Sequence, residues 1–140
     1  MMKKSLLLLA ALILGGCATH WPETALLNPQ VIPSNQQYYS GNRITMEGVD
    51  KREAAYVFSI KKKEKAPVLV NSSQPLNNLL AEKLAEGLRS QGLEVGNSGT
   101  TNLTLAISTA AVTVEEKTFT YVTKSRVSLQ VIADFQGSKL

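Results

Sequence analysis

The sequence has very little of the residue types on which most site chemistry depends. Among 140 residues it has one cysteine, Cys17, and one histidine, His20. A single cysteine excludes a disulfide framework and a cysteine-based metal centre, and a single histidine argues against a metal site built from imidazoles. We therefore expect a domain held together by packing alone, with no metal and no cofactor.

Catalytic motifs are scarce as well. No serine lies in a Gly-x-Ser-x-Gly elbow, and the glycines near residue 96 lack the lysine of a phosphate-binding loop. His20 lies three residues after Cys17 in an irregular segment, where a general base has no rigid frame. Carboxylates such as Asp50 and Asp134 can in principle be paired for glycoside cleavage, but nothing in the sequence singles out a pair. The sequence therefore predicts a protein that is not an enzyme.

The amino terminus has the pattern of a bacterial lipoprotein signal. After two lysines, residues 5–13 form an apolar run that is shorter than the roughly 20 residues of a membrane-spanning helix. The run ends at Leu14-Gly15-Gly16-Cys17, which resembles the lipobox. We predict that residues 1–16 are a signal peptide, that cleavage falls between Gly16 and Cys17, and that the thiol of Cys17 is lipidated. Because each buried methylene contributes about 0.8 kcal/mol, two or three acyl chains, palmitate among them, make a stable membrane anchor.

Residue 18 indicates the membrane in which the lipoprotein is anchored, and the net charge argues against one class of partner. An aspartate after the lipidated cysteine favours inner-membrane retention in proteobacteria, so Ala18 predicts the outer membrane of a Gram-negative bacterium, facing the periplasm. The chain carries a net charge of +4, and loss of the two signal-peptide lysines leaves +2. A charge this small and scattered argues against nucleic-acid binding.

Residues 17–40 are predicted to form the lipidated N-terminus and a tether. Three prolines among polar residues give this segment no sustained period. Its aliphatic residues leave open that the distal half docks onto the domain; they are Leu26, Leu27, Val31 and Ile32. Its aromatic residues are candidates either for contact with a membrane interface or partner or for packing the tether onto the domain; they are Trp21, Tyr38 and Tyr39.

Residues 41–140 are predicted to form one α+β periplasmic domain. Alternating apolar residues indicate strands at 43–47, ended by Gly48, and at 55–60, and an apolar strand follows at 68–70. A leucine stripe at helical spacing predicts a helix that begins near Pro75, is capped by Ser72 or Ser73, and ends before Gly92. Gly87 lies in the same stripe, which predicts that the helix approaches a sheet closely there.

The longest alternating pattern occupies the C-terminal third of the chain. Its phase slips between Ile107 and Val112, which predicts a β-bulge near residues 109–111, and a turn is expected at 115–117. From Phe119 to Phe135 the odd positions are mostly apolar, which predicts the second strand of an antiparallel hairpin with one solvated face. The expected fold is a mainly antiparallel sheet, with a long C-terminal hairpin and one amphipathic helix packed on one face.

Several of these features together resemble one family. The lipobox, the Val68-Leu69-Val70 strand before the leucine-rich helix, the Gln91-Gly92-Leu93-Glu94-Val95 segment and the long hairpin resemble the YajG family of uncharacterised bacterial lipoproteins. The resemblance implies a further strand and a terminal helix after the position of Leu140, so we expect this sequence to be a truncated member. The family has no established activity, so the resemblance implies a class of protein rather than a function.

The lysines at positions 61, 62, 63 and 65 support two interpretations. Lys61, Lys62, Lys63 and Lys65 can contact lipopolysaccharide phosphates or another anionic surface. They can equally form a solvated turn whose charges protect a sheet edge from aggregation, and the interrupting Glu64 favours this interpretation.

Three functions remain open from the sequence. The leading hypothesis is a non-enzymatic accessory that binds another envelope protein through a sheet edge or the tether, because open edges suit strand addition. The alternative is a module that binds an envelope glycan or lipid through the lysines and the gap between the helix and the sheet. The weakest is a carboxylate-dependent hydrolase.

Overall fold

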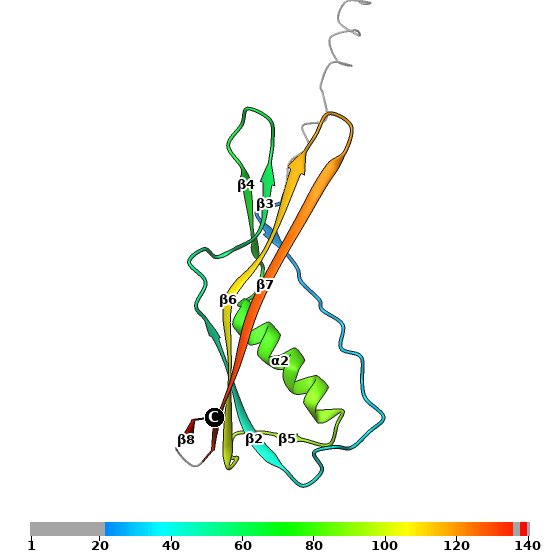
Figure 1. Cartoon of the computed structure of the whole chain (residues 1–140), viewed down its shortest axis with the longest axis vertical. Helices are drawn as coiled ribbons and strands as arrows, with labels where there is room; N and C mark the ends of the chain where they lie inside the picture. Colours follow the sequence, from blue (N-terminus) through cyan, green and yellow to red (C-terminus); the bar gives the residue numbers. More distant parts are fainter. Residues whose placement is uncertain (1–21, 136–137, 140) are drawn as a thin grey trace, which may run out of the picture.

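A computed structural model describes residues 22–135 and 138–139 of the chain. Within them, one helix lies against one face of an eight-stranded sheet, as Figure 1 shows. The elements in chain order are β1 (Thr24–Ala25), β2 (Arg43–Asp50), β3 (Tyr56–Lys61), β4 (Val68–Ser72), α2 (Leu76–Arg89), β5 (Glu94–Val95), β6 (Thr101–Glu116), β7 (Tyr121–Phe135) and β8 (Ser138–Lys139). No helix among the described residues is long and apolar enough to cross a membrane.

The sheet is mixed, and the predicted mainly antiparallel sheet is wrong. Four of the seven strand pairings are parallel: β1–β4, β2–β5, β2–β6 and β3–β6. The antiparallel pairings are β3–β4, β6–β7 and β7–β8. β2 and β3 follow one another along one edge of β6 and run in its direction, β2 beside Thr101–Ile107 and β3 beside Val112–Glu115. Alternation shows which residues share a face of a strand, but it does not show the direction of the neighbouring strand.

The long hairpin predicted from the sequence is present. β6 and β7 pair antiparallel along their whole length, and their register shifts between Ile107 and Thr109, next to the expected bulge. The turn lies at residues 117–120 rather than 115–117, because β6 continues to Glu116 and β7 begins only at Tyr121, two residues after Phe119. β2 likewise continues through Gly48 to Asp50, because β6 pairs with it over that length.

The helix begins where its sequence predicts but without the predicted cap. Pro75 is the N-cap residue and no side chain caps the helix, since Ser72 still belongs to β4. After the helix, Gly92 has φ +89°, a left-handed conformation that suits glycine. The close approach of helix and sheet lies at Gly48 of β2, where an added Cβ would lie 2.3 Å from the Asn77 carbonyl oxygen. Gly87 faces Val31 instead, at an ordinary 3.5 Å from an added Cβ.

The core lies between α2 and the middle of the sheet. Val57, Leu76, Leu79 and Ile107 form its buried cluster, and Leu27 packs against it. The segment from residue 26 to residue 42 runs beside the helix (Figure 1), and its backbone is held by the Ser34 N–H donating to Ser90 Oγ at 3.1 Å. Leu26 and Ile32 remain exposed.

Candidate functional site

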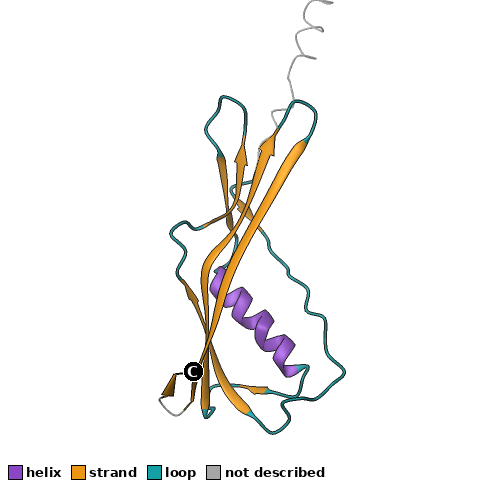
Figure 2. Cartoon of the chain, viewed as in Figure 1, coloured by secondary structure: helices purple, strands orange, loops and turns teal. Residues whose placement is uncertain are grey.

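The first candidate site is the outer edge of β7. β7 lies at the border of the sheet beyond β6, and Figure 2 shows it running from one end of the molecule to the other. Among the described residues, only the short β8 pairs with its outer edge, at Asp134 and Phe135. The backbone of Tyr121–Ala133 therefore has no described strand on that side. An edge of this length is a template for adding another strand.

One face of β7 continues the hydrophobic core sideways. Leu129 lies opposite Ile107, and Val131 lies opposite Leu105. Directly paired residues share a face of the sheet, and Ile107 packs against α2. The odd-numbered residues of β7 therefore face the helix side, although α2 lies over β2, β5 and β6.

The apolar residues of β7 are exposed where their partners on β6 are buried. Leu105 and Ile107 are 3% and 0% exposed, whereas Leu129 is 46% and Val131 is 53% exposed. Val127 on the same face is 64% exposed. The prediction of a hairpin with one solvated face is wrong for β7, because both faces of this strand are exposed over most of its length. We call Val127, Leu129 and Val131 the apolar stripe.

The second candidate site is a basic groove between two hairpin loops. The β3–β4 loop (residues 62–67) and the β6–β7 loop (residues 117–120) border a groove of about 880 Å³. Its lining contains the four lysines singled out in the sequence and three charged residues that were not; the lining residues are Lys61, Lys62, Lys63, Lys65, Glu115, Glu116, Lys117 and Thr118. Glu115 pairs with Lys117 at 3.4 Å and with Lys124 at 3.9 Å. The added groups were missed because only the pairing of β3 with β6 brings them together.

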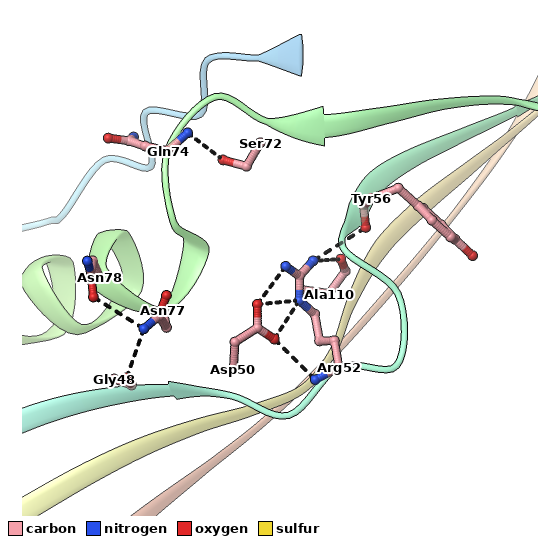
Figure 3. A network of polar contacts seen from close by, with 9 residues as sticks. All are labelled: Gly48, Asp50, Arg52, Tyr56, Ser72, Gln74, Asn77, Asn78 and Ala110. Atoms are coloured by element: carbon pink, nitrogen blue, oxygen red, sulfur yellow. Dashed lines mark hydrogen bonds and ion pairs between the residues drawn. The ribbon is translucent and has the colours of Figure 1, made fainter. Parts of the chain in front are cut away.

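A polar network ties the loop between β2 and β3 to the bulge of β6 (Figure 3). The Arg52 guanidinium donates to both carboxylate oxygens of Asp50, with Nε 2.9 Å from Oδ1 and Nη2 2.8 Å from Oδ2. Its Nη1 also donates to the carbonyl oxygens of Tyr56, at 3.3 Å, and Ala110, at 3.5 Å. The Arg52 side chain is only 7% exposed. These hydrogen bonds lower the pKa of the Asp50 carboxyl below its usual value, and the network stabilises the loop.

The two aspartates considered for hydrolysis are far apart. Asp50 aligns with Ile107 of β6 and Asp134 aligns with Asn102, so they differ by five positions along β6, or about 17 Å at roughly 3.4 Å per residue. They also face opposite sides of the sheet, because positions 102 and 107 differ by an odd number. Paired glycosidase carboxylates lie within about 10 Å, so these two do not form such a pair. Asp134 Oδ1 is buried and accepts no hydrogen bond from the described residues.

The remaining candidate residues give no further assembled site. Ser59 and Lys62 have the spacing of a Ser-x-x-Lys motif, and Ser59 is buried. The motif does not bring the two side chains together here, because residues three apart meet on a helix and not on an extended strand such as β3. Among the described residues, no group of three His, Cys, Asp or Glu side chains is placed to hold a metal. Tyr38 and Tyr39 contact each other, with ring centroids 6.3 Å apart. Cys17, His20 and Trp21 lie outside the described residues.

Comparison with known families supports the lipoprotein pattern at the amino terminus. The sequence profile of a family described as uncharacterized lipoprotein matches residues 29–140, four fifths of the chain. The chain belongs to this lipoprotein family. The match begins after the lipobox, so the family and the N-terminal signal are independent indications of membrane association through lipid. Comparisons with curated proteins and with solved structures gave no match.

We predict that Arg52→Met destabilises the fold by about 2 kcal/mol, because it leaves the Asp50 carboxylate and two carbonyl groups without their donor. The ion pair with Arg52 lowers the pKa of the Asp50 carboxyl. The pair therefore stabilises the folded state fully above the ordinary pKa of 3.8, and this stabilisation is lost as the pH falls through the lowered pKa. Urea unfolding from pH 7 to pH 2 measures both effects. A loss of stability that is equally large at pH 2 would contradict this role for the ion pair.

Proposed function

We propose that this lipoprotein is a non-enzymatic accessory of the cell envelope that binds an extended segment of another envelope protein along β7. The observation that carries the proposal is the apolar stripe, which continues the buried core and is left uncovered by α2. Scattered exposed apolar side chains are ordinary on protein surfaces, whereas a contiguous row beside an unpaired backbone edge is typical of an interaction site.

Strand addition accounts for both features of β7 at once. A segment that pairs with the edge of Tyr121–Ala133 gains main-chain hydrogen bonds along the strand. Its alternate side chains then reach over the apolar stripe, so that the partner buries residues which the described part of this chain leaves in solvent. Backbone pairing supplies affinity, and the alternating side chains supply specificity.

The charges of β7 define the partner further. The opposite face of the strand carries Lys124 and Arg126, both exposed. Like charges directly opposite each other on a sheet are destabilising, and opposite charges are stabilising. The partner segment is therefore expected to alternate apolar residues, facing the stripe, with acidic or neutral residues on the other face.

The proposal also includes a cellular location and a more specific family. We place the protein in the outer membrane, facing the periplasm, on the basis of Ala18 after the lipobox cysteine. We also assign it to the YajG family on the basis of the residues quoted above. Support for both comes from the sequence and from membership of a lipoprotein family.

Leu129→Lys is expected to reduce capture of the partner about tenfold, because a buried interface anchor contributes roughly 1–2 kcal/mol. In-cell cross-linking of the full lipoprotein, affinity capture and mass spectrometry measure the effect. Ser128→Lys is the matched control, since it adds the same charge at the next exposed residue on the opposite face. Both variants should unfold within about 0.5 kcal/mol of the parent. If both capture the same protein equally well, or if the parent captures none, the proposal is wrong.

A further inference from the structure

One end of the molecule carries an unusual combination of charge and exposed aromatic surface. The β3–β4 and β6–β7 loops lie side by side at this end (Figures 1 and 2). Phe119 at the tip of the second loop is 95% exposed. One exposed phenylalanine is ordinary by itself, but this one lies in a loop that borders the lysines of the basic groove, and basic residues beside exposed aromatic side chains are typical of surfaces that lie on lipid headgroups.

The charge at this end is positive. Residues 61–65 and 115–124 together contain six lysines and three glutamates, a net charge of +3. Lys61, Lys63 and Lys65 are exposed and make no ion pair with the described residues. Glu115 pairs with Lys117 and Lys124. The three exposed lysines of the first loop are therefore available to an anionic surface.

The direction of β1 shows from which end of the molecule the described chain enters the sheet. β4 runs away from the β3–β4 loop, and β1 is parallel to it, with Thr24 opposite Asn71. The Asn71 N–H donates to the Glu23 carbonyl oxygen at 3.0 Å, so the pairing begins before Thr24. The chain that precedes Thr24 therefore approaches from the side of the two loops.

The distance from β1 to the lipidation site fits this arrangement. Val68 lies three residues before Asn71 on β4, or about 10 Å toward the loop. Thr24 lies seven positions after Cys17, and an extended chain of that length reaches up to about 25 Å. Cys17 is thus able to lie at the level of the loops, where the lysines and Phe119 are.

We propose that the two hairpin loops rest on the surface of the bilayer that holds the Cys17 acyl chains, with the lysines against anionic phospholipid headgroups and Phe119 at headgroup depth. The proposal uses the predicted lipidation of Cys17. Lysines near an anionic leaflet each favour the bound state about fivefold, and the effect is confined to roughly 8 Å at physiological salt. The anchor keeps the loops within that range, so a weak contact suffices to orient the domain.

This orientation has a consequence for the proposed function. β7 begins next to the membrane-facing loop and runs toward the opposite end, where residues 94–101 lie. The apolar stripe is then held upright above the lipid surface, where a periplasmic or membrane-embedded partner can reach it.

The test uses the mature lipidated protein reconstituted into vesicles. Because Cys17 is occupied by lipid, Thr118→Cys supplies a single thiol for an environment-sensitive fluorophore in the loop, and Asn97→Cys supplies the same label at the opposite end. Vesicles contain phosphatidylcholine alone or with phosphatidylglycerol, plus a lipid with a nitroxide on its headgroup. We expect strong quenching at residue 118 in phosphatidylglycerol vesicles, at least twofold weaker quenching without that lipid or at high salt, and little quenching at residue 97.

Charge reversal separates the lysines from the anchor. Lys61→Glu/Lys63→Glu/Lys65→Glu should reduce quenching at residue 118 to the level seen at residue 97, and the single Lys63→Glu should act more weakly in the same direction. Lys51→Glu, an exposed lysine outside both loops, should change nothing. Equal quenching at residues 118 and 97, or no response to the triple reversal, overturns the proposal. A protein that fails to float with the vesicles also overturns the proposal, because it then lacks the Cys17 anchor on which the proposal rests. That result would not test the binding of a partner along β7.

Discussion

Replacement of Cys17 by alanine should remove the protein from the membrane fraction almost completely. The apolar run at residues 5–13 is too short to span a bilayer and is predicted to leave with the signal peptide, so the acyl chains on Cys17 are expected to supply nearly all of the membrane affinity. Carbonate-washed membranes and metabolic labelling with an alkyne-bearing fatty acid measure anchoring and lipidation separately. The parent should be labelled and sediment, and Cys17→Ala should do neither.

His20→Ala is the matched control for this change, because it alters a neighbouring residue of the same segment and leaves the lipobox intact. It should sediment and label as the parent does. A Cys17→Ala protein that resists a carbonate wash would refute the predicted anchor, and with it the membrane-facing loops. Residual binding that is lost in carbonate or high salt would instead be the contact made by the lysines, which is far weaker than two or three buried acyl chains.

Local features of the fold were predictable because they depend on residues close in sequence. The leucine spacing gave the helix, Gly92 marks the residue range where it ends, and the change of phase after Ile107 located the bulge. The sheet was not predictable in the same way. Nothing in the alternation of residues 43–47 and 55–60 shows that both strands lie along β6 in the same direction.

The candidate sites follow the same division. The lysines of residues 61–65 were visible as a charged run, but Lys117 and the two glutamates join them only through tertiary pairing. The apolar odd positions of β7 were also visible, and alternation normally means that one face is buried. Their exposure depends on how far α2 extends across the sheet, which the sequence of β7 does not contain.

Gly48→Ala should destabilise the domain by about 2–4 kcal/mol, because the added Cβ meets the first turn of α2. A Cβ at this position would lie 2.3 Å from the carbonyl oxygen and 2.8 Å from the carbonyl carbon of Asn77, so the first turn of α2 has to move away from β2. That movement also breaks the 2.9 Å hydrogen bond from Asn77 Nδ2 to the Gly48 carbonyl oxygen. Overpacking costs about 1–3 kcal/mol, occasionally more, and the lost hydrogen bond adds about 1 kcal/mol.

Gly96→Ala separates this steric effect from the general effect of replacing glycine. An added Cβ at Gly96 has no atom within 4 Å, and its backbone is not left-handed. Its free energy of unfolding in urea should stay within about 0.5 kcal/mol of the parent. Because α2 moves as a unit, Gly48→Ala should also expose Leu76 and Leu79, which increases binding of a hydrophobic dye before unfolding. If the two variants unfold at the same urea concentration, α2 and β2 are not in close contact at Gly48, and the prediction is wrong.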